Sequence, residues 1–201
     1  SVAVLGIFQV GLAAILFARN LRSPAQTADL IAGIRESVAA PLFLALDQEG
    51  GRVNRLREIE PLFHRLPPGR VQAGWGAGRI QAVWAAVGHA LAALGVDVDF
   101  HPIVDLDDGP GLNAIGDRSF GVAAEPVVAG LEQAGIAGCL KHFPGLGGSD
   151  LDTHVALATS PLSAEDLWER HLLPYRALAA EASMVMTAHA HYPAVDGDAP
   201  R

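Results

Sequence analysis

The sequence predicts an α/β fold, an incomplete parallel barrel of the (β/α)8 TIM type, and three observations lead to this prediction. Short apolar runs alternate with helical patterns along the chain. Each apolar run ends in polar residues. Hydrophobic residues make up 50% of the 201 residues and charged residues 18%, so the chain can bury a sizeable core. We therefore expect one globular domain over residues 1–201.

The expected strands are short apolar segments. Five segments have this character: 13–17, 41–46, 96–104, 138–140 and 183–186. Residues 2–8 are a candidate sixth strand. Because a complete barrel of this type takes about 250 residues and eight strands, the barrel in this chain is expected to be partial.

Capping residues and glycines mark the ends of the expected helices. Ser23 is followed by a proline, which is favoured at the first position of a helix. Gly95 stands where a helix is expected to stop. The Ser163-x-x-Asp166 pattern resembles a capping box and opens a helix expected to run to about Ala182. No repeat or linker divides the chain, so these helices belong to one domain.

The first 18 residues, SVAVLGIFQVGLAAILFA, approach the length of a membrane-spanning helix. Gln9 and two glycines interrupt this run, and β-branched residues are frequent in it. It also lacks the basic segment that begins a signal peptide. A buried strand is therefore favoured, and a signal or membrane segment is the alternative.

Charge and cysteine content limit the classes of partner. A net charge of -8 argues against nucleic acids and anionic membranes, since both are bound by clustered lysine and arginine. Any anionic ligand must be held by a few local cations. The single Cys139 cannot form an internal disulfide, which fits a reducing compartment. The sequence thus favours a cytoplasmic protein that binds neither nucleic acid nor membrane.

Polar residues follow each expected strand at the point where it ends. They are Arg19-Asn20, Asp47-Gln48-Glu49, Asp105 with Asp107, Lys141-His142, and His189 with His191. In a parallel α/β barrel the loops after the strands converge, and active sites lie there. A doubly wound sheet also binds ligands at strand ends, but at a switch point fed by fewer strands. Five such endings therefore favour the barrel and one shared site.

Five segments, in order along the chain, resemble signatures of the family 3 glycoside hydrolases. They are LDQEGGRVNRL (46–56), FHPIVDL (100–106), IGDRSFG (115–121), KHFPGLGGSDLDTH (141–154) and VMTAHAHYPAVD (185–196). Within that family they are most similar to the bacterial β-N-acetylglucosaminidases of cell-wall recycling. The resemblance implies that residues 1–201 are a single, partial N-terminal catalytic barrel domain of this family.

The resemblance also implies five residues that hold an N-acetylglucosamine ring. Asp47 matches the aspartate of the DQEGG motif, and Arg55 matches the second arginine after it. Arg118 matches the arginine of the GDRxFG motif, and Lys141 and His142 match an adjacent lysine and histidine. Carboxylates accept hydrogen bonds from sugar hydroxyls, while cations donate to hydroxyls and to the carboxylate of a muramic acid neighbour. Without the resemblance, Arg118 would be interpreted as half of a structural salt bridge in a turn.

For the proton donor, the resemblance implies a histidine on a mobile loop, oriented by an aspartate two residues earlier. Asp152 and His154 hold these positions. Imidazole can donate a proton and then act as a base, while the carboxylate fixes its tautomer. Three glycines would let residues 145–154 move over a bound sugar. The family usually has histidine at Leu146 and aspartate at Gly148, so polar support for the loop is expected to be weaker here.

The nucleophile implied by the resemblance is an aspartate in a DDL-like motif beyond the TAH strand, and the sequence contains no such motif. Asp196 and Asp198 match loop acids of the family and receive no role. We therefore expect a retaining glycoside hydrolase that removes terminal β-linked N-acetylglucosamine in peptidoglycan recycling, with this chain inactive alone. The alternative is a non-catalytic sugar-binding relic or a fragment of such an enzyme.

A metal-dependent barrel hydrolase is a third hypothesis, with His101, His142, His189, His191 and Asp47 as ligands. The two last histidines face the same side only if their strand continues that far. The resemblance itself implies neither a metal nor a cofactor. The partner it implies is a muropeptide or disaccharide that contains N-acetylglucosamine. Exposed edges of an incomplete barrel would favour self-association.

Overall fold

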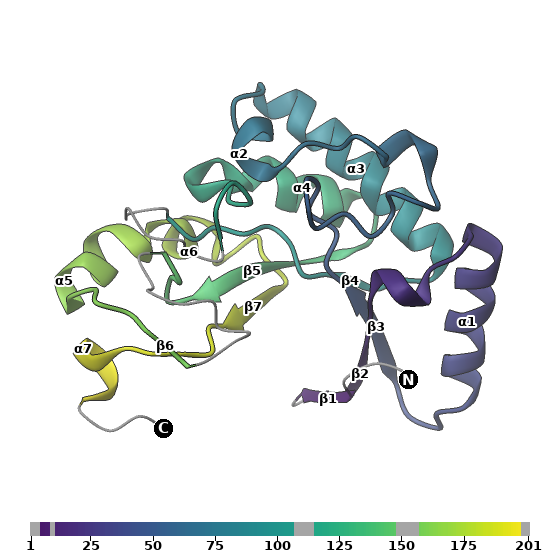
Figure 1. The fold of residues 1–201 in the computed structure, drawn as a ribbon, viewed down its shortest axis with the longest axis horizontal. Helices are drawn as coiled ribbons and strands as arrows, with labels where there is room; N and C mark the ends of the chain where they lie inside the picture. The colour runs from purple at the N-terminus through teal and green to yellow at the C-terminus, as the bar shows by residue number, and fades with distance from the viewer. Residues whose placement is uncertain (1–4, 9–10, 107–114, 148–156, 198–201) are drawn as a thin grey trace.

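The computed structural model describes residues 5–8, 11–106, 115–147 and 157–197. Within these residues, the main sheet has six strands, in the order β1 (Leu5–Phe8), β2 (Gly11–Leu16), β3 (Leu42–Leu46), β4 (Val98–Asp99), β5 (Ala137–Phe143) and β7 (Met184–Thr187). β1 is antiparallel to β2, and all other neighbours are parallel (Figure 1). The parallel strands thus follow one another in chain order, as in an α/β barrel.

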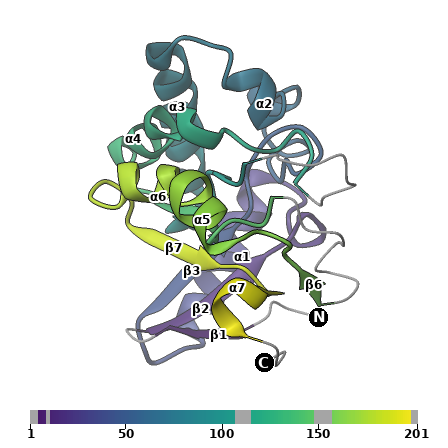
Figure 2. The same cartoon turned by 90° about the vertical axis from the view of Figure 1, so that its left-hand side faces the viewer.

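This order confirms the predicted partial barrel and excludes a doubly wound sheet, in which the strand order reverses at a switch point. The five parallel strands form a curved sheet with α3 (Ala77–Leu94) and α4 (Glu125–Gln133) on its outer side, as Figures 1 and 2 show. Apart from the helical segment that follows Ser163, the other described helical elements are η1 (Ala18–Asn20), α1 (Pro24–Glu36), η2 (Pro61–Phe63), α2 (Gly69–Gln72), η3 (Gly121–Ala124) and α7 (Pro193–Asp196). Two short strands, β6 (Ala158–Thr159) and β8 (Ala190–His191), pair in parallel outside the main sheet.

The expected strands are all present, with two corrections. The segment expected over 96–104 shrinks to β4, because Pro102 has no backbone N–H with which to continue the ladder. The candidate sixth strand forms β1, but it is a hairpin partner of β2 and not a barrel strand. The strand interpretation of the N-terminal run is confirmed over β1 and β2. Within the described residues, no helix is long and apolar enough to cross a membrane.

Two helix ends lie where the sequence places them. The Ser23 hydroxyl accepts a hydrogen bond from the backbone N–H of Gln26 and so caps α1. At the end of α3, Gly95 adopts the left-handed conformation, with φ of 90°, which glycine tolerates without strain. Both signals are local, which explains why they are readable from the sequence.

The capping box before the next helical segment is also confirmed. The Ser163 hydroxyl accepts from the Asp166 N–H at 3.0 Å, and the Asp166 carboxylate accepts from the Ser163 N–H at 3.3 Å. The segment that follows has three parts, α5 (Ala164–Asp166), a π-helical turn (Leu167–His171) and α6 (Leu173–Leu178). It therefore ends before the expected Ala182.

The core is divided by the main sheet into an outer and an inner part, since alternate strand residues face opposite sides. The large outer cluster lies between the sheet and the helices, and its fully buried members include Leu16, Leu44, Trp84, Leu91 and Leu131. The small inner cluster contains Ala45, Val98, Phe100 and Cys139, with Ile15, Met184 and Met186 packed against it. This inner cluster lies on the side of the sheet that would be the inside of the barrel.

Candidate active site

A pocket of about 410 Å³ opens at the carboxyl ends of the parallel strands. Each parallel strand contributes at least one lining residue from its end or directly after it: Phe17, Asp47, Phe100, His142 and Met186. The pocket therefore occupies the position at which active sites of α/β barrels are found. Part of its apolar lining, Ile15, Phe100 and Met186, belongs to the inner cluster of the core.

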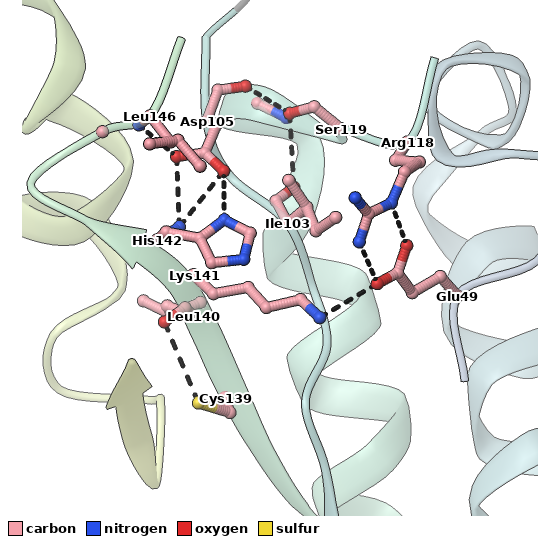
Figure 3. Close-up of polar contacts among 12 residues, drawn as sticks. Glu49, Ile103, Asp105, Arg118, Ser119, Cys139, Leu140, Lys141, His142 and Leu146 are labelled. Carbon is pink, nitrogen blue, oxygen red and sulfur yellow. Dashed lines mark hydrogen bonds and ion pairs between the residues drawn. The ribbon is translucent and has the colours of Figure 1, made fainter. Parts of the chain in front are cut away.

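The five residues predicted to hold a sugar all line this pocket: Asp47, Arg55, Arg118, Lys141 and His142. The prediction that they converge is thus confirmed, although they come from three segments of the chain. Figure 3 shows Arg118, Lys141 and His142 lying close to one another across strand β5 and the neighbouring loops. A few charged groups above an apolar floor is the usual composition of a small-molecule site.

Lys141 is the buried cation at the base of the pocket, with 2% of its side chain exposed. Its Nζ lies 2.6 Å from Oδ1 of Asp47 and 2.9 Å from Oε1 of Glu49. Burial by itself would lower the pKa of Lys141, but the charges of Glu49 and Asp47 outweigh this effect and raise it. Lys141 therefore stays charged at neutral pH, and it fixes the Asp47 carboxylate at the pocket wall.

Glu49 joins this lysine to Arg118. The Nε and Nη2 atoms of Arg118 each donate to a Glu49 oxygen at 2.7 Å, which is a bidentate pair (Figure 3). Burial would raise the pKa of Glu49, but the charge of Lys141 and the hydrogen bonds from Arg118 lower it to about 2. Arg118 does form a salt bridge, then, but with Glu49 in the loop after β3, not within its own turn.

His142 is held by a second buried carboxylate. Its Nδ1 lies 2.8 Å from Oδ2 of Asp105, and its backbone N–H donates to both Asp105 oxygens at 3.1 and 3.2 Å. The Asp105 side chain is fully buried, whereas 19% of the His142 side chain is exposed. Glu49 and Asp105 were absent from the predicted site residues, although each lies in the polar ending of a strand and in one of the segments that resemble the family.

The loop after β3, which carries Asp47 and Arg55, is fixed by Gln48. The Gln48 backbone N–H donates to Oδ1 of Asp99 at 2.8 Å, and its side-chain oxygen accepts from the Leu56 N–H at 3.0 Å. Asp99 is fully buried, and burial raises its pKa well above the usual value. Arg55 pairs more loosely with Asp47 than Lys141 does, with 3.9 Å between the Arg55 Nη2 and Oδ2 of Asp47.

The described geometry gives the metal hypothesis no support. Among the described residues, no group of three or more His, Cys, Asp or Glu side chains is placed to hold a metal ion. His101 is a core residue, stacked on Trp84 with ring centroids 4.3 Å apart, and burial lowers its pKa to about 3. The strand condition for His189 and His191 is not met, because β7 ends at Thr187.

Asp152 and His154, the expected proton donor and its partner, lie outside the described residues, as do Gly148 and Asp198. The same holds for residues 148–154 of the expected mobile loop.

The start of that loop, residues 145–147, is anchored. Leu146 is buried in an apolar cluster with Ile103 and Ile115, and its N–H donates to Oδ1 of Asp105 at 2.7 Å. The Gly145 carbonyl accepts a hydrogen bond from the Tyr192 hydroxyl at 3.0 Å. Here the leucine that replaces the family's histidine contributes apolar packing in place of polar support.

Comparison with known proteins agrees with this geometry. Residues 3–201 match the glycosyl hydrolase family 3 N-terminal domain. The chain is 39% identical over 202 residues to a β-hexosaminidase of Nitrosomonas eutropha, covering 90% of this chain and 56% of that protein. A β-hexosaminidase of Xylella fastidiosa is 42% identical over 199 residues, with coverage of 90% and 57%. The chain thus spans little more than half the length of the curated relatives it matches.

Solved structures show the same relationship. The structure of a family 3 β-N-acetylglucosaminidase from Paenibacillus sp. str. FPU-7 matches 92% of this chain and 37% of that one, with a TM-score of 0.83 and 37% identity. NagZ from Neisseria gonorrhoeae, in complex with N-trifluoroacetyl-D-glucosamine, matches 91% of this chain and 57% of its own, with a TM-score of 0.81 and 34% identity. With its motifs, its strand order and its matched length in agreement, this chain belongs to glycosyl hydrolase family 3.

Proposed function

We propose that the chain is the sugar-binding, N-terminal part of a retaining β-N-acetylglucosaminidase that removes terminal β-linked N-acetylglucosamine. The observation that supports this most is the convergence of five polar side chains, predicted from three family motifs, on one pocket at the strand ends. The names of the relatives agree, since they include β-hexosaminidases and a β-N-acetylglucosaminidase. In this proposal residues 1–201 are one partial catalytic barrel domain.

Each group in the pocket has a role in this reaction. Asp47 accepts hydrogen bonds from sugar hydroxyls, Arg55, Arg118 and Lys141 donate to hydroxyl or carbonyl oxygens, and the imidazole of His142 hydrogen-bonds to a hydroxyl. The 2.6 Å contact between Lys141 and Asp47 keeps these two groups in a fixed relative position before a sugar arrives. Binding at the strand ends would then hold the glycosidic bond at the mouth of the pocket.

The chemical step needs two further groups. His154 gives a proton to the leaving oxygen and then takes one from water, while Asp152 orients its imidazole. A carboxylate must also attack the anomeric carbon to form the glycosyl-enzyme intermediate. The family motif for that carboxylate is absent from residues 1–201. The chain by itself is therefore expected to bind the sugar without turning it over.

For the natural substrate we propose a muropeptide or disaccharide in peptidoglycan recycling. The chain has a net charge of -8, yet three arginines, Arg52, Arg55 and Arg118, line the pocket, so an anionic sugar would be held by local cations. A neighbouring muramic acid carries such a carboxylate. We further propose a cytoplasmic location, because Cys139 is a free, buried thiol.

Calorimetric titration of the chain with N-acetylglucosamine tests this function. We expect saturable binding that is weaker for glucose, which lacks the acetamido group, and that is lost in Lys141→Met. Hydrolysis of 4-nitrophenyl N-acetyl-β-glucosaminide by the isolated chain should be close to the buffer rate. Equal affinity for both sugars, or for wild type and Lys141→Met, would refute the sugar site. Robust hydrolysis that is lost in Asp196→Ala would refute the expectation that this chain lacks the nucleophile.

A further inference from the structure

Asp105 lies directly behind His142, on the side away from the pocket. Its side chain is fully buried and does not line the pocket, whereas His142 does. Its carboxylate accepts from the His142 backbone N–H and approaches Nδ1 of the same residue at 2.8 Å. Figure 3 shows the carboxylate and the imidazole facing each other, with the second ring nitrogen on the opposite side.

The contacts of this carboxylate determine which ring nitrogen carries hydrogen. Oδ1 accepts from the Leu146 N–H at 2.7 Å, and both oxygens accept from the His142 N–H. A carboxylate with these partners acts as an acceptor, so the contact with Nδ1 requires a hydrogen on Nδ1. In the neutral imidazole this leaves Nε2 as an acceptor, and in the charged form Nε2 is a second donor.

Asp105 is itself held in place by the turn that carries Arg118. The Ser119 hydroxyl donates to the Asp105 carbonyl oxygen at 2.5 Å, and the Gly121 N–H donates to that hydroxyl at 2.9 Å. One buried residue therefore connects three parts of the site: the end of β5, the start of the glycine-rich segment, and the turn behind the arginine. A side chain fixed by this many partners gives His142 a single orientation.

We propose that Asp105 is a positioning residue that acts through His142: it keeps hydrogen on Nδ1 and so presents Nε2 to a sugar hydroxyl in the pocket. This inference rests on the proposed sugar-binding function. Its structural half, the protonation of Nδ1, does not require a ligand and can be tested in the free chain.

The substitution Asp105→Asn is suited to this test because it keeps the shape of the side chain and replaces one oxygen with an N–H donor. Facing Nδ1, that donor favours an imidazole with hydrogen on Nε2 only, the reverse of the wild-type arrangement. Long-range ¹⁵N–¹H spectra of imidazole groups distinguish the two arrangements. The His142→Gln variant identifies the signals of this residue among the eight histidines.

In the wild type we expect Nδ1 of His142 to give the shift of a protonated nitrogen, and in Asp105→Asn the shift of an unprotonated one. Wild-type spectra with an unprotonated Nδ1 would overturn the inference whether or not the variant folds. Ser119→Ala is the control, since it removes a hydrogen bond to the Asp105 backbone and leaves the carboxylate unchanged. It is expected to lower the melting temperature without changing the protonation of His142.

A double-mutant cycle with N-acetylglucosamine then tests the coupling to the ligand. Asp105→Asn should weaken binding about tenfold, the effect of one hydrogen bond to a charged or polarised group. On a His142→Gln background the same substitution should change affinity by less than about twofold, because the residue it acts through is gone. Equal losses on both backgrounds would show a merely structural role. Absence of sugar binding by the wild type would instead refute the proposed function and leave the spectra to decide the inference.

Discussion

Among single residues, Glu49 has the largest expected effect on stability, because it is buried and neutralises two cations. Replacing it with glutamine leaves Lys141 and Arg118 without their shared anion, and removing one partner of a buried ion pair costs roughly 3–5 kcal/mol. We predict a loss of this size in the free energy of unfolding of Glu49→Gln at pH 7, measured by urea denaturation. Glu58→Gln, at an exposed position, is the control and should be within about 0.5 kcal/mol of wild type.

The stabilising effect of Glu49 is also expected to depend on pH. The pKa of Glu49 falls from its ordinary value of 4.5 to about 2 on folding, so its contribution is complete above about pH 4.5 and is lost as the pH falls towards 2. The difference in unfolding free energy between wild type and Glu49→Gln should therefore be constant above pH 4.5 and shrink below it. A difference that grows on acidification would contradict the ion-pair assignment.

His154 gives a prediction about catalysis in a protein that joins this chain to the family's nucleophile motif. Proton donation matters most when the departing oxygen is strongly basic. We predict that His154→Ala reduces kcat/KM for alkyl β-N-acetylglucosaminides far more than for nitrophenyl ones. Equal reductions for both classes of leaving group would remove His154 from the role of general acid.

The sequence predicted the site residues to which a family motif gives a binding role. It missed those whose role depends on contacts that only the folded chain makes. Asp47, Arg118 and Lys141 were found because each lies in a recognisable family segment. Glu49 and Asp105 lie in two of these segments as well, but no role was assigned to them, because their partners are 69 and 37 residues away and only the folded sheet brings them together. Their burial, which makes them effective anchors, has no signature in the local sequence.

At the scale of elements, the contact of α3 with α4 depends on glycines in both helices. A Cβ on Gly130 would lie 2.6 Å from the Gln81 carbonyl oxygen, so the two helices could not approach as closely. We predict that Gly130→Ala destabilises the fold by about 1–3 kcal/mol, the usual cost of overpacking. Gly33→Ala, in α1 with open space around it, should stabilise by up to about 1 kcal/mol.

Thermal and urea unfolding of both variants measure the change in unfolding free energy. Both substitutions gain the same helix propensity, so a loss of stability in Gly130→Ala and a gain in Gly33→Ala would isolate the effect of packing. Stabilisation by both substitutions would show that α3 and α4 can move apart at little cost.

Helix ends were predictable because their sequence signals are local. The bounds and directions of strands were less so, because they depend on pairing with another strand. The caps at Ser23, Gly95 and Ser163 are formed by neighbouring residues, and all three are confirmed. The direction of β1 and the shortening of β4 depend on the partner strand and on one proline, so apolar runs alone could not show them. The π-helical turn within the segment from Ala164 to Leu178 also has no sequence signal that we can identify.

For the whole molecule, the open sheet predicts self-association. Among the strands of the described residues, β7 is at the edge of the main sheet, and Val185 within it is 50% exposed. Unpaired edges with apolar side chains tend to pair with another chain, and a lysine at such an edge opposes this. We predict oligomers in light scattering at high concentration that Val185→Lys reduces. Val122→Lys, at an exposed valine in η3, should leave them unchanged, and equal effects of both would contradict edge pairing.

The claim on which the account depends is that the pocket at the strand ends binds N-acetylglucosamine through residues from separate strands. A crystal structure of the chain soaked with this sugar tests the claim most directly. We predict that the ring lies over Ile15 and Phe100, with hydroxyls within hydrogen-bond distance of Asp47, Lys141 and Nε2 of His142. Density for the sugar elsewhere, such as the second pocket, which Ala28 of α1 and Ala90 of α3 line, with none in the pocket at the strand ends, would contradict the account.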